Sequence, residues 1–412
     1  MALIIHHEPC LFNSNSYNNV VSTKTKQIKW PIFSEDEINA THRVLASGKV
    51  NYWTGNEGKQ FEKEFSHYFG ANHSIAVSNG TVALELALEA IGIQPGDEVI
   101  IPSCTFIATA SAVVMRGATP VIADIEPYKL TICPKSVRSK LTSKTKVIIC
   151  VHLGGIPCNL DELSLIASEN NCYLIEDCAQ AHGASYNGKK VGSVGDISAF
   201  SFCQDKIMTT GGEGGMVSTN SELLWKRAWE FKDHGKSYDS VYNREHPPGF
   251  RWHHESFGTN FRMTEMQSAI GRVQLKLLDS WLTTRRFNAE KIWASAKKFS
   301  CFSLPIIPEN CISAYYKCYI FVNEDQLQDG WSRDRIMGEI NSLGTPCFSG
   351  SCTEIYKEKC FKPFKLVYQK ALPNALDMGK RSLMFLIDPT IDREKIMATV
   401  HAIESVGSLA SK

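Results

Sequence analysis

Between residues 74 and 217 the chain repeats one unit, a short apolar segment followed by a turn and then by a segment with helical periodicity. The short segments are rich in β-branched residues, which favours buried strands. Strands are expected at 74–77, 97–101, 119–122, 147–151 and 173–175, and well-defined helices between them at 81–91 and 107–114. This alternation predicts an α/β fold with a largely parallel sheet covered by helices on both faces. Ligands bind such sheets at the carboxyl ends of the strands, so functional residues should follow the strands directly.

Composition excludes several classes of protein. The chain has 412 residues, of which 43% are hydrophobic, so it can bury a large core and is long enough for two domains. Its net charge of +1 gives no indication of a nucleic-acid partner or an anionic membrane surface. No apolar run approaches the roughly 18 residues of a membrane span. The 14 cysteines show no paired spacing, which indicates reduced thiols, a cytoplasmic protein and no zinc site.

The chain ends differ from its centre. Residues 1–28 are rich in Asn and Ser after a short apolar start, and we expect them to form a mobile N-terminal arm. A long helical segment at 264–299 changes character near Thr283 and Thr284. We place the domain boundary there, with a large domain at 29–284 and a smaller C-terminal α/β domain at 285–412.

Candidate ligand contacts follow three of the expected strands. Gly80 and Thr81 open a helix whose N-terminal amide groups and dipole suit a phosphate group, although the same residues also begin ordinary helices. Phe106 lies where a flat ring could stack on it, unless it belongs to the core. Asp177 ends another strand and needs a partner if it is buried. That partner would be either a protonated ring nitrogen or the amide groups of a helix that Asp177 caps.

Lys206 lies between an apolar run that ends at Phe202 and a cluster of glycines. If the folded chain removes it from water, its amine becomes a nucleophile for carbonyl groups. Lowering the pKa of a lysine from ~10.4 to near neutral requires roughly 4 kcal/mol from its surroundings. The alternative is a solvated loop lysine, which is the commoner situation.

The segment around Lys206 resembles the Schiff-base motif of the DegT/DnrJ/EryC1/StrS family of sugar aminotransferases, which use pyridoxal 5′-phosphate. The family motif contains S-F-x-x-x-K followed by a glycine-rich run, here Ser201, Phe202, Lys206 and 210–215. Cys203 replaces a frequent histidine, and the turn has one additional glycine. The resemblance extends from about Trp30 to the C-terminus. It implies a fold-type I, aspartate aminotransferase-like transferase.

The resemblance also implies roles for individual residues. It assigns Lys206 as the Schiff-base lysine and Asp177 as the partner of the pyridine nitrogen. The other predicted cofactor contacts are Gly80, Thr81 and Ser201 at the phosphate, Phe106 on the ring face and Gln180 near the ring hydroxyl.

A long polar and aromatic segment at 234–258 precedes a second resemblance. The four histidines of this segment have no spacing typical of a metal site, and we expect no metal. Residues 258–265 resemble the family's G-x-N-x-R-M segment, in which the asparagine reaches the cofactor phosphate of the neighbouring subunit. Asn260 is therefore the predicted residue that acts across a homodimer with shared active sites, whereas Arg262 is expected to be structural.

The implied reaction transfers an amino group from glutamate or glutamine to a keto sugar. The acceptor in this family is most often a nucleotide-linked 4-keto-6-deoxyhexose of lipopolysaccharide or other polysaccharide and deoxysugar biosynthesis. Two alternatives remain. A sugar dehydratase of the same fold commonly has histidine in place of the lysine, and Lys206 argues against it. A non-enzymatic regulatory or scaffold protein would not need Asp177, Gln180, Ser201 and Lys206 together.

Overall fold

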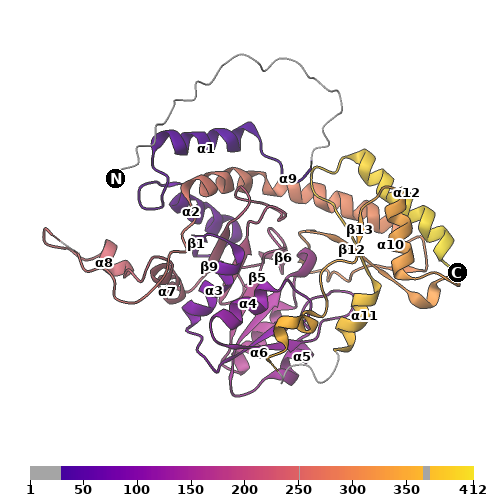
Figure 1. The fold of residues 1–412 in the computed structure, drawn as a ribbon, viewed down its shortest axis with the longest axis horizontal. Helices are drawn as coiled ribbons and strands as arrows, with labels where there is room; N and C mark the ends of the chain where they lie inside the picture. Colours follow the sequence, from indigo (N-terminus) through magenta and orange to yellow (C-terminus); the bar gives the residue numbers. More distant parts are fainter. Residues whose placement is uncertain (1–28, 250, 365–371) are drawn as a thin grey trace, which may run out of the picture.

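The computed structural model describes residues 29–249, 251–364 and 372–412, so the predicted N-terminal arm lies outside the described residues. Its centre is a seven-stranded sheet with strand order β1-β9-β8-β5-β4-β2-β3 (Figure 1). These strands are β1 (His73–Val77), β2 (Glu98–Pro102), β3 (Thr119–Ala123), β4 (Thr145–Val151), β5 (Tyr173–Asp177), β8 (Ile197–Ser201) and β9 (Gly215–Thr219). The predicted strands between residues 74 and 175 are therefore confirmed.

Five strands of this sheet, from β8 through β5, β4 and β2 to β3, pair in parallel as predicted. The exception is β9, which runs antiparallel to both of its neighbours, β1 and β8. A tight loop, residues 202–214, joins β8 to β9, and a connection this short returns the chain in the opposite direction. That loop carries Lys206, so the lysine is held at the carboxyl end of β8.

Helices cover both faces of the sheet, as predicted. One face packs against α2 (Glu57–Phe69), α5 (Pro134–Lys140) and α6 (Leu160–Glu169) through a core that includes Phe61, Phe65 and Leu163. The other face packs against α3 (Gly80–Ile91), α4 (Ala108–Met115) and α7 (Glu222–Lys232) through a core that includes Leu86, Val113 and Trp229. The strands are buried on both sides, which explains their nearly continuous apolar sequences.

The helix α9 (Glu265–Ala296) links the main sheet to the C-terminal part of the chain. A capping box of Thr264 and Gln267 fixes its start. The helix packs against α1 (Glu35–Ser47) and α2 near its start and against α12 (Arg393–Ala410) near its end (Figure 1). It runs without interruption through residue 284, so the predicted boundary falls inside a continuous helix and the division into two domains stays a prediction.

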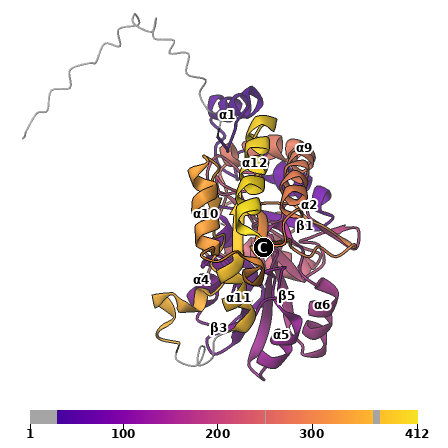
Figure 2. The ribbon, with the colours of Figure 1, turned by 90° about the vertical axis from the view of Figure 1, so that its right-hand side faces the viewer.

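The C-terminal part builds a second, antiparallel sheet with order β10-β12-β14-β13. Its strands are β10 (Phe302–Ser303), β12 (Cys318–Val322), β13 (Cys347–Phe348) and β14 (Ser382–Phe385). Figure 2 shows α9, α12 and α10 (Arg333–Ser342) side by side next to this sheet, where they share a separate core. The remaining elements are α8 (Tyr238–Tyr242), α11 (Pro373–Arg381), the short strands β6 (Ser185–Tyr186), β7 (Lys189–Lys190) and β11 (Cys311–Ile312), and the 3-10 turns η1 (Leu153–Gly155), η2 (Glu324–Gln326), η3 (Ile355–Lys357) and η4 (Lys359–Phe361).

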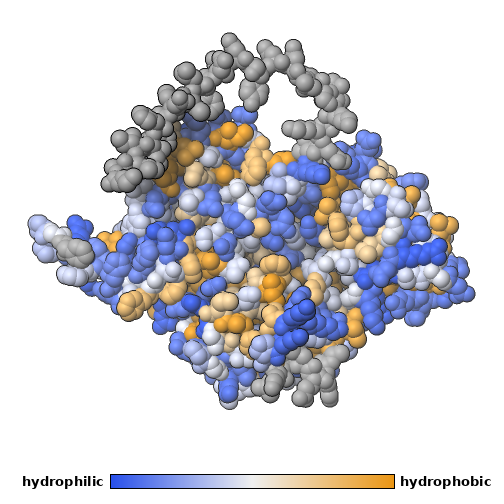
Figure 3. All heavy atoms as spheres, viewed as in Figure 1, coloured by the Kyte–Doolittle hydropathy of each residue, from blue (hydrophilic) through white to orange (hydrophobic). Residues whose placement is uncertain are grey.

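The surface in Figure 3 mixes hydrophilic and hydrophobic residues over the face seen in Figure 1. Among the described residues, no helix has both the length and the apolar character that crossing a bilayer would require. Every cysteine in the described ranges is a free thiol, and most of them are buried.

Candidate active site

The loop that carries Lys206 is closed by backbone hydrogen bonds, from Phe202 N to Gly214 O (2.8 Å) and from Thr210 N to Phe202 O (3.3 Å). Trp30 fixes the lysine's own backbone by donating from its indole nitrogen to Lys206 O over 2.9 Å. The side chain of Lys206 is 16% exposed, and its Nζ lies 3.6 Å from Asp205 Oδ1. This is a confined lysine at a strand end, which contradicts the interpretation as a solvated loop lysine.

Asp177 ends β5 and is buried. Thr109 Oγ1 donates to Asp177 Oδ2 over 3.0 Å, and Ala179 N donates to Oδ1 over 3.1 Å. No helix begins here, because the residues that follow form turns, so the alternative that Asp177 caps a helix is wrong. Burial raises the pKa of Asp177, and the two hydrogen bonds partly offset that shift. A buried carboxylate with this geometry can hold a proton on an adjacent ring nitrogen.

The start of α3 and the end of β8 are in direct contact. A Cβ at Gly80 would lie 2.5 Å from Ser201 Cβ, and a Cβ at Gly215 would lie 2.4 Å from Asn79 O. Glycine at both positions therefore lets two strands and one helix converge. The Asn79 side chain caps α3 by accepting from Val82 N (2.9 Å), and the first amide groups of a helix have no partner within it. The cradle formed by Gly80, Thr81 and Ser201 fits a phosphate group.

Gln180 lies on the other side of Asp177. Its Oε1 accepts from Gly154 N over 2.8 Å, and Gly154 has a positive φ of 63°. A left-handed backbone conformation is natural for glycine, so this residue can direct its amide toward the Gln180 side chain. Gln180 is thereby held by the η1 turn that follows β4.

Two predicted site residues lie differently. Phe106 is 69% exposed, just before α4, so it is not part of the core. Asn260 is exposed, and its Oδ1 accepts from Arg262 N over 3.3 Å. Arg262 forms an ion pair of 2.7 Å with the buried Asp233, which agrees with its expected structural role. The carbonyl of Phe261 accepts from Ser78 N (3.0 Å), so this segment runs beside the end of β1.

Sequence reasoning missed several partners. Thr105 and Thr109 form a hydroxyl pair (2.8 Å) one helical turn apart that supports Asp177, and this spacing is visible in the sequence. Tyr316 donates from its hydroxyl to Asp205 although the two residues are far apart in the chain. Its ring also lies under Lys206, with Nζ 5.0 Å from the centroid. No local pattern announces a contact of this range.

Glu176 points to the opposite face of β5 from Asp177. It accepts from His152 Nε2 (3.0 Å) and from the amide groups of Gly192, Val194 and Gly195. Burial alone would raise the pKa of Glu176, but these donors hold it below its usual range. His152, Glu176 and Cys178 lie close enough to suggest a metal site within the described residues. Hydrogen bonds already engage the carboxylate, so the group is a structural network.

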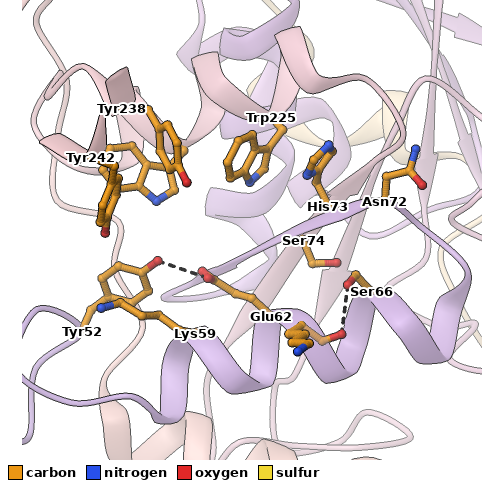
Figure 4. Close-up of a pocket in the computed structure, with 12 residues that line it drawn as sticks. Tyr52, Lys59, Glu62, Ser66, Asn72, His73, Ser74, Trp225, Tyr238 and Tyr242 are labelled. Atoms are coloured by element: carbon orange, nitrogen blue, oxygen red, sulfur yellow. Dashed lines mark hydrogen bonds between the residues drawn. The ribbon is translucent and has the colours of Figure 1, made fainter. Parts of the chain in front are cut away.

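A cavity of about 400 Å³ lies away from these residues, between α2, β1, α7 and α8 (Figure 4). Its walls include Tyr52, Glu62, Trp225 and Tyr238, and Tyr52 donates to Glu62 over 3.1 Å. None of the predicted cofactor contacts lines it.

Comparison with known proteins tests the resemblance. The model of the DegT/DnrJ/EryC1/StrS aminotransferase family matches residues 31–404, most of the chain. The chain belongs to this family. The predicted family, the fold-type I class, the aminotransferase class of enzyme and its pyridoxal-phosphate cofactor are thereby confirmed.

Individual relatives agree with this membership. The chain is 43% identical over 232 residues to GDP-perosamine synthase of Escherichia coli O157:H7, a match that covers 56% of the chain and 61% of that relative, less than two thirds of it. An aminotransferase structure from Psychrobacter cryohalolentis is 51% identical, with a TM-score of 0.90 over 92% of this chain and 98% of that one. The structure of NtdA from Bacillus subtilis with bound PMP, 27% identical, has a TM-score of 0.79 over 91% of this chain and 82% of that one.

Proposed function

We propose that this protein transfers the amino group of glutamate or glutamine to a nucleotide-linked keto sugar. The acceptor we favour is a 4-keto-6-deoxyhexose used in lipopolysaccharide or other polysaccharide and deoxysugar biosynthesis. The observation that carries the proposal is the convergence of Lys206, Asp177, Gln180 and the Gly80–Ser201 contact at the carboxyl ends of β8 and β5 and at the start of α3. The similarity to a relative named GDP-perosamine synthase supports a nucleotide-linked sugar.

Each residue has a role that follows from its position. Pyridoxal phosphate, when bound, supplies an electron sink for the carbanion that forms at the amino-bearing carbon. Lys206 attaches the cofactor covalently and, once released, moves the proton at that carbon. Asp177, oriented by Thr109, holds the proton on the ring nitrogen. Gln180, fixed by Gly154, contacts the ring hydroxyl.

The phosphate and the ring face are assigned to the remaining predicted residues. Gly80, Thr81 and Ser201 bind the phosphate through amide and hydroxyl groups where α3 meets β8. Phe106 stacks on the ring, which gives a reason for its 69% exposure in the chain without cofactor.

We further propose that the active unit is a homodimer with shared sites and that it works in the cytoplasm. Phe257 is 99% exposed and lies within the long segment before Asn260, where aromatic side chains are typical of a protein interface. Asn260 would reach the phosphate bound by the partner subunit.

A spectroscopic assay tests the proposal. With pyridoxal phosphate the protein should develop a visible absorption band, glutamate or glutamine should remove it, and a nucleotide-linked 4-keto-6-deoxyhexose should restore it. Mass spectrometry of the sugar should show an amino group in place of the keto oxygen. A deoxygenated sugar without nitrogen would indicate the dehydratase alternative, and the absence of any visible band would indicate a scaffold protein.

A further inference from the structure

A second lysine shares the aromatic ring that lies under Lys206. The Nζ of Lys317 lies 4.7 Å from the centroid of the Tyr316 ring, and the Nζ of Lys206 lies 5.0 Å from the same centroid. The two ammonium groups are therefore at most about 10 Å apart. The ring itself is fixed, because the Tyr316 hydroxyl donates to Asp205.

The backbone around Lys317 is tied to the turn that holds Gln180. Tyr316 N donates to Gly154 O over 2.9 Å, and Ala314 N donates to Gly155 O over 3.0 Å. Gly154 N in turn donates to Gln180 Oε1. Lys317 thus stands at the start of β12 in a fixed relation to the predicted cofactor contacts, although it comes from the second sheet.

Positive charge exceeds negative charge in this region. Arg285 is fully buried behind Tyr316, donates to Tyr316 O over 3.3 Å, and has its pKa lowered to about 10 by burial. The nearby carboxylates are Asp205 and Asp388, against Lys206, Lys317 and Arg285. Asp205 is already engaged by Lys206 and by the Tyr316 hydroxyl.

Within the described ranges, no carboxylate lies within ion-pair distance of the Lys317 ammonium. The side chain is largely removed from water, and burial lowers the pKa of Lys317, an effect that Asp205 partly offsets. A cation held this way without a partner costs free energy, and an anion in front of it would recover that cost. The site lacks one negative charge beside the reactive lysine.

We propose that Lys317 binds a carboxylate of the amino donor, and the same carboxylate of the 2-oxo acid that the donor becomes. The inference rests on the proposed function, because it assigns the amino-acid half of that reaction to this place. An amino dicarboxylate such as glutamate can place its nitrogen at Lys206 while a carboxylate reaches Lys317 across the Tyr316 ring. The keto sugar carries no carboxylate, so Lys317 contributes to the donor half of the reaction and not to the acceptor half.

The test uses the cofactor-loaded enzyme and the variants Lys317→Met, Lys317→Gln and Lys317→Arg. The probe is glutarate, an unreactive dicarboxylate, whose binding is measured by calorimetry. We expect Lys317→Met and Lys317→Gln to weaken glutarate binding at least tenfold and Lys317→Arg to retain it. The concentration of glutamate that gives half-maximal loss of the visible band should rise by a similar factor, whereas the half-reaction with the keto sugar should be unchanged.

Lys190→Met is the matched control. Lys190 is another half-buried lysine over an aromatic ring, with Nζ 4.0 Å from the Tyr68 centroid, and burial lowers its pKa too. This variant should bind glutarate and glutamate as the native enzyme does. Native-like binding by Lys317→Met, equal weakening of donor and sugar, or no glutarate binding by the native enzyme would each overturn the assignment of Lys317. A native enzyme that binds glutarate but does not react with any amino donor would instead contradict the proposed function.

Discussion

Asp177 shows how a single residue is prepared for its role. Both of its oxygens accept hydrogen bonds, from Thr109 and from Ala179, while the carboxylate is buried. Asp177→Asn keeps the shape and removes the charge, so we expect kcat to fall roughly 10³-fold, since each factor of ten is about 1.4 kcal/mol. Steady-state kinetics with donor and keto sugar measure this. An Asn variant with the native rate would mean that the residue has only a structural role.

His182 provides a test of the same site through pH. Burial lowers the pKa of His182 to about 3, and the charges of Lys206 and Arg285 lower it further. An unfolded histidine has a pKa near 6.5, so above that value His182 is neutral in both states and its contribution to stability is fully present. As the pH falls from about 6.5 toward about 3, only the unfolded chain takes up this proton, and stability is lost at about 1.4 kcal/mol per pH unit.

The variant His182→Leu removes this proton uptake. It should lose less stability than the native protein between pH 6.5 and pH 5, a difference of about 2 kcal/mol from one proton. Denaturant unfolding at both pH values measures the difference. Parallel losses in the two proteins would show that His182 is not protonated selectively on unfolding.

At the scale of elements, the contact between α3 and β8 creates the phosphate cradle. A methyl group at Gly80 would approach Ser201 to 2.5 Å, and the start of α3 would have to move away from β8. We expect Gly80→Ala to weaken the binding of pyridoxal phosphate at least tenfold in an absorbance titration. Gly338→Ala is the control, because Gly338 lies in α10 with no atom within 4 Å of the added methyl group. Equal affinities of the two variants would remove the cradle from the account.

Hydrophobic periodicity predicted the elements well, because β1–β5 are buried on both faces and α3 and α4 alternate with them. The lysine loop and its glycines were also predicted, since glycine clusters mark close backbone approach. The antiparallel β9 and the Tyr316–Asp205 contact were not predicted, because they depend on how distant segments meet. For the same reason the sequence left Asp177 open between two roles, and only the turn after β5 excludes a helix cap.

At the scale of the whole molecule, the shared site is the main expectation. Asn260 is exposed, and its neighbour Phe261 accepts from Ser78 near the phosphate cradle of the same chain. A mixed dimer separates the two arrangements. If Asn260 acts in the partner's site, mixing Lys206→Ala with Asn260→Ala chains places both changes in one site and leaves the other intact, so activity should recover to a substantial fraction of one native site.

The contrary result is equally clear. No recovery, with subunit exchange demonstrated by differently tagged chains, would place Asn260 and Lys206 in the site of one chain. Each variant dimer alone serves as the control and should show little activity.

The central claim is that Lys206 is the residue that attaches pyridoxal phosphate. Borohydride reduction of the protein loaded with pyridoxal phosphate, followed by digestion and peptide mass spectrometry, tests it directly. The account predicts a reduced cofactor on the peptide that contains Lys206, and its loss in Lys206→Ala, which should fold normally and lack transamination. A cofactor found mainly on other lysines, or a Lys206→Ala variant that still transaminates, would contradict it.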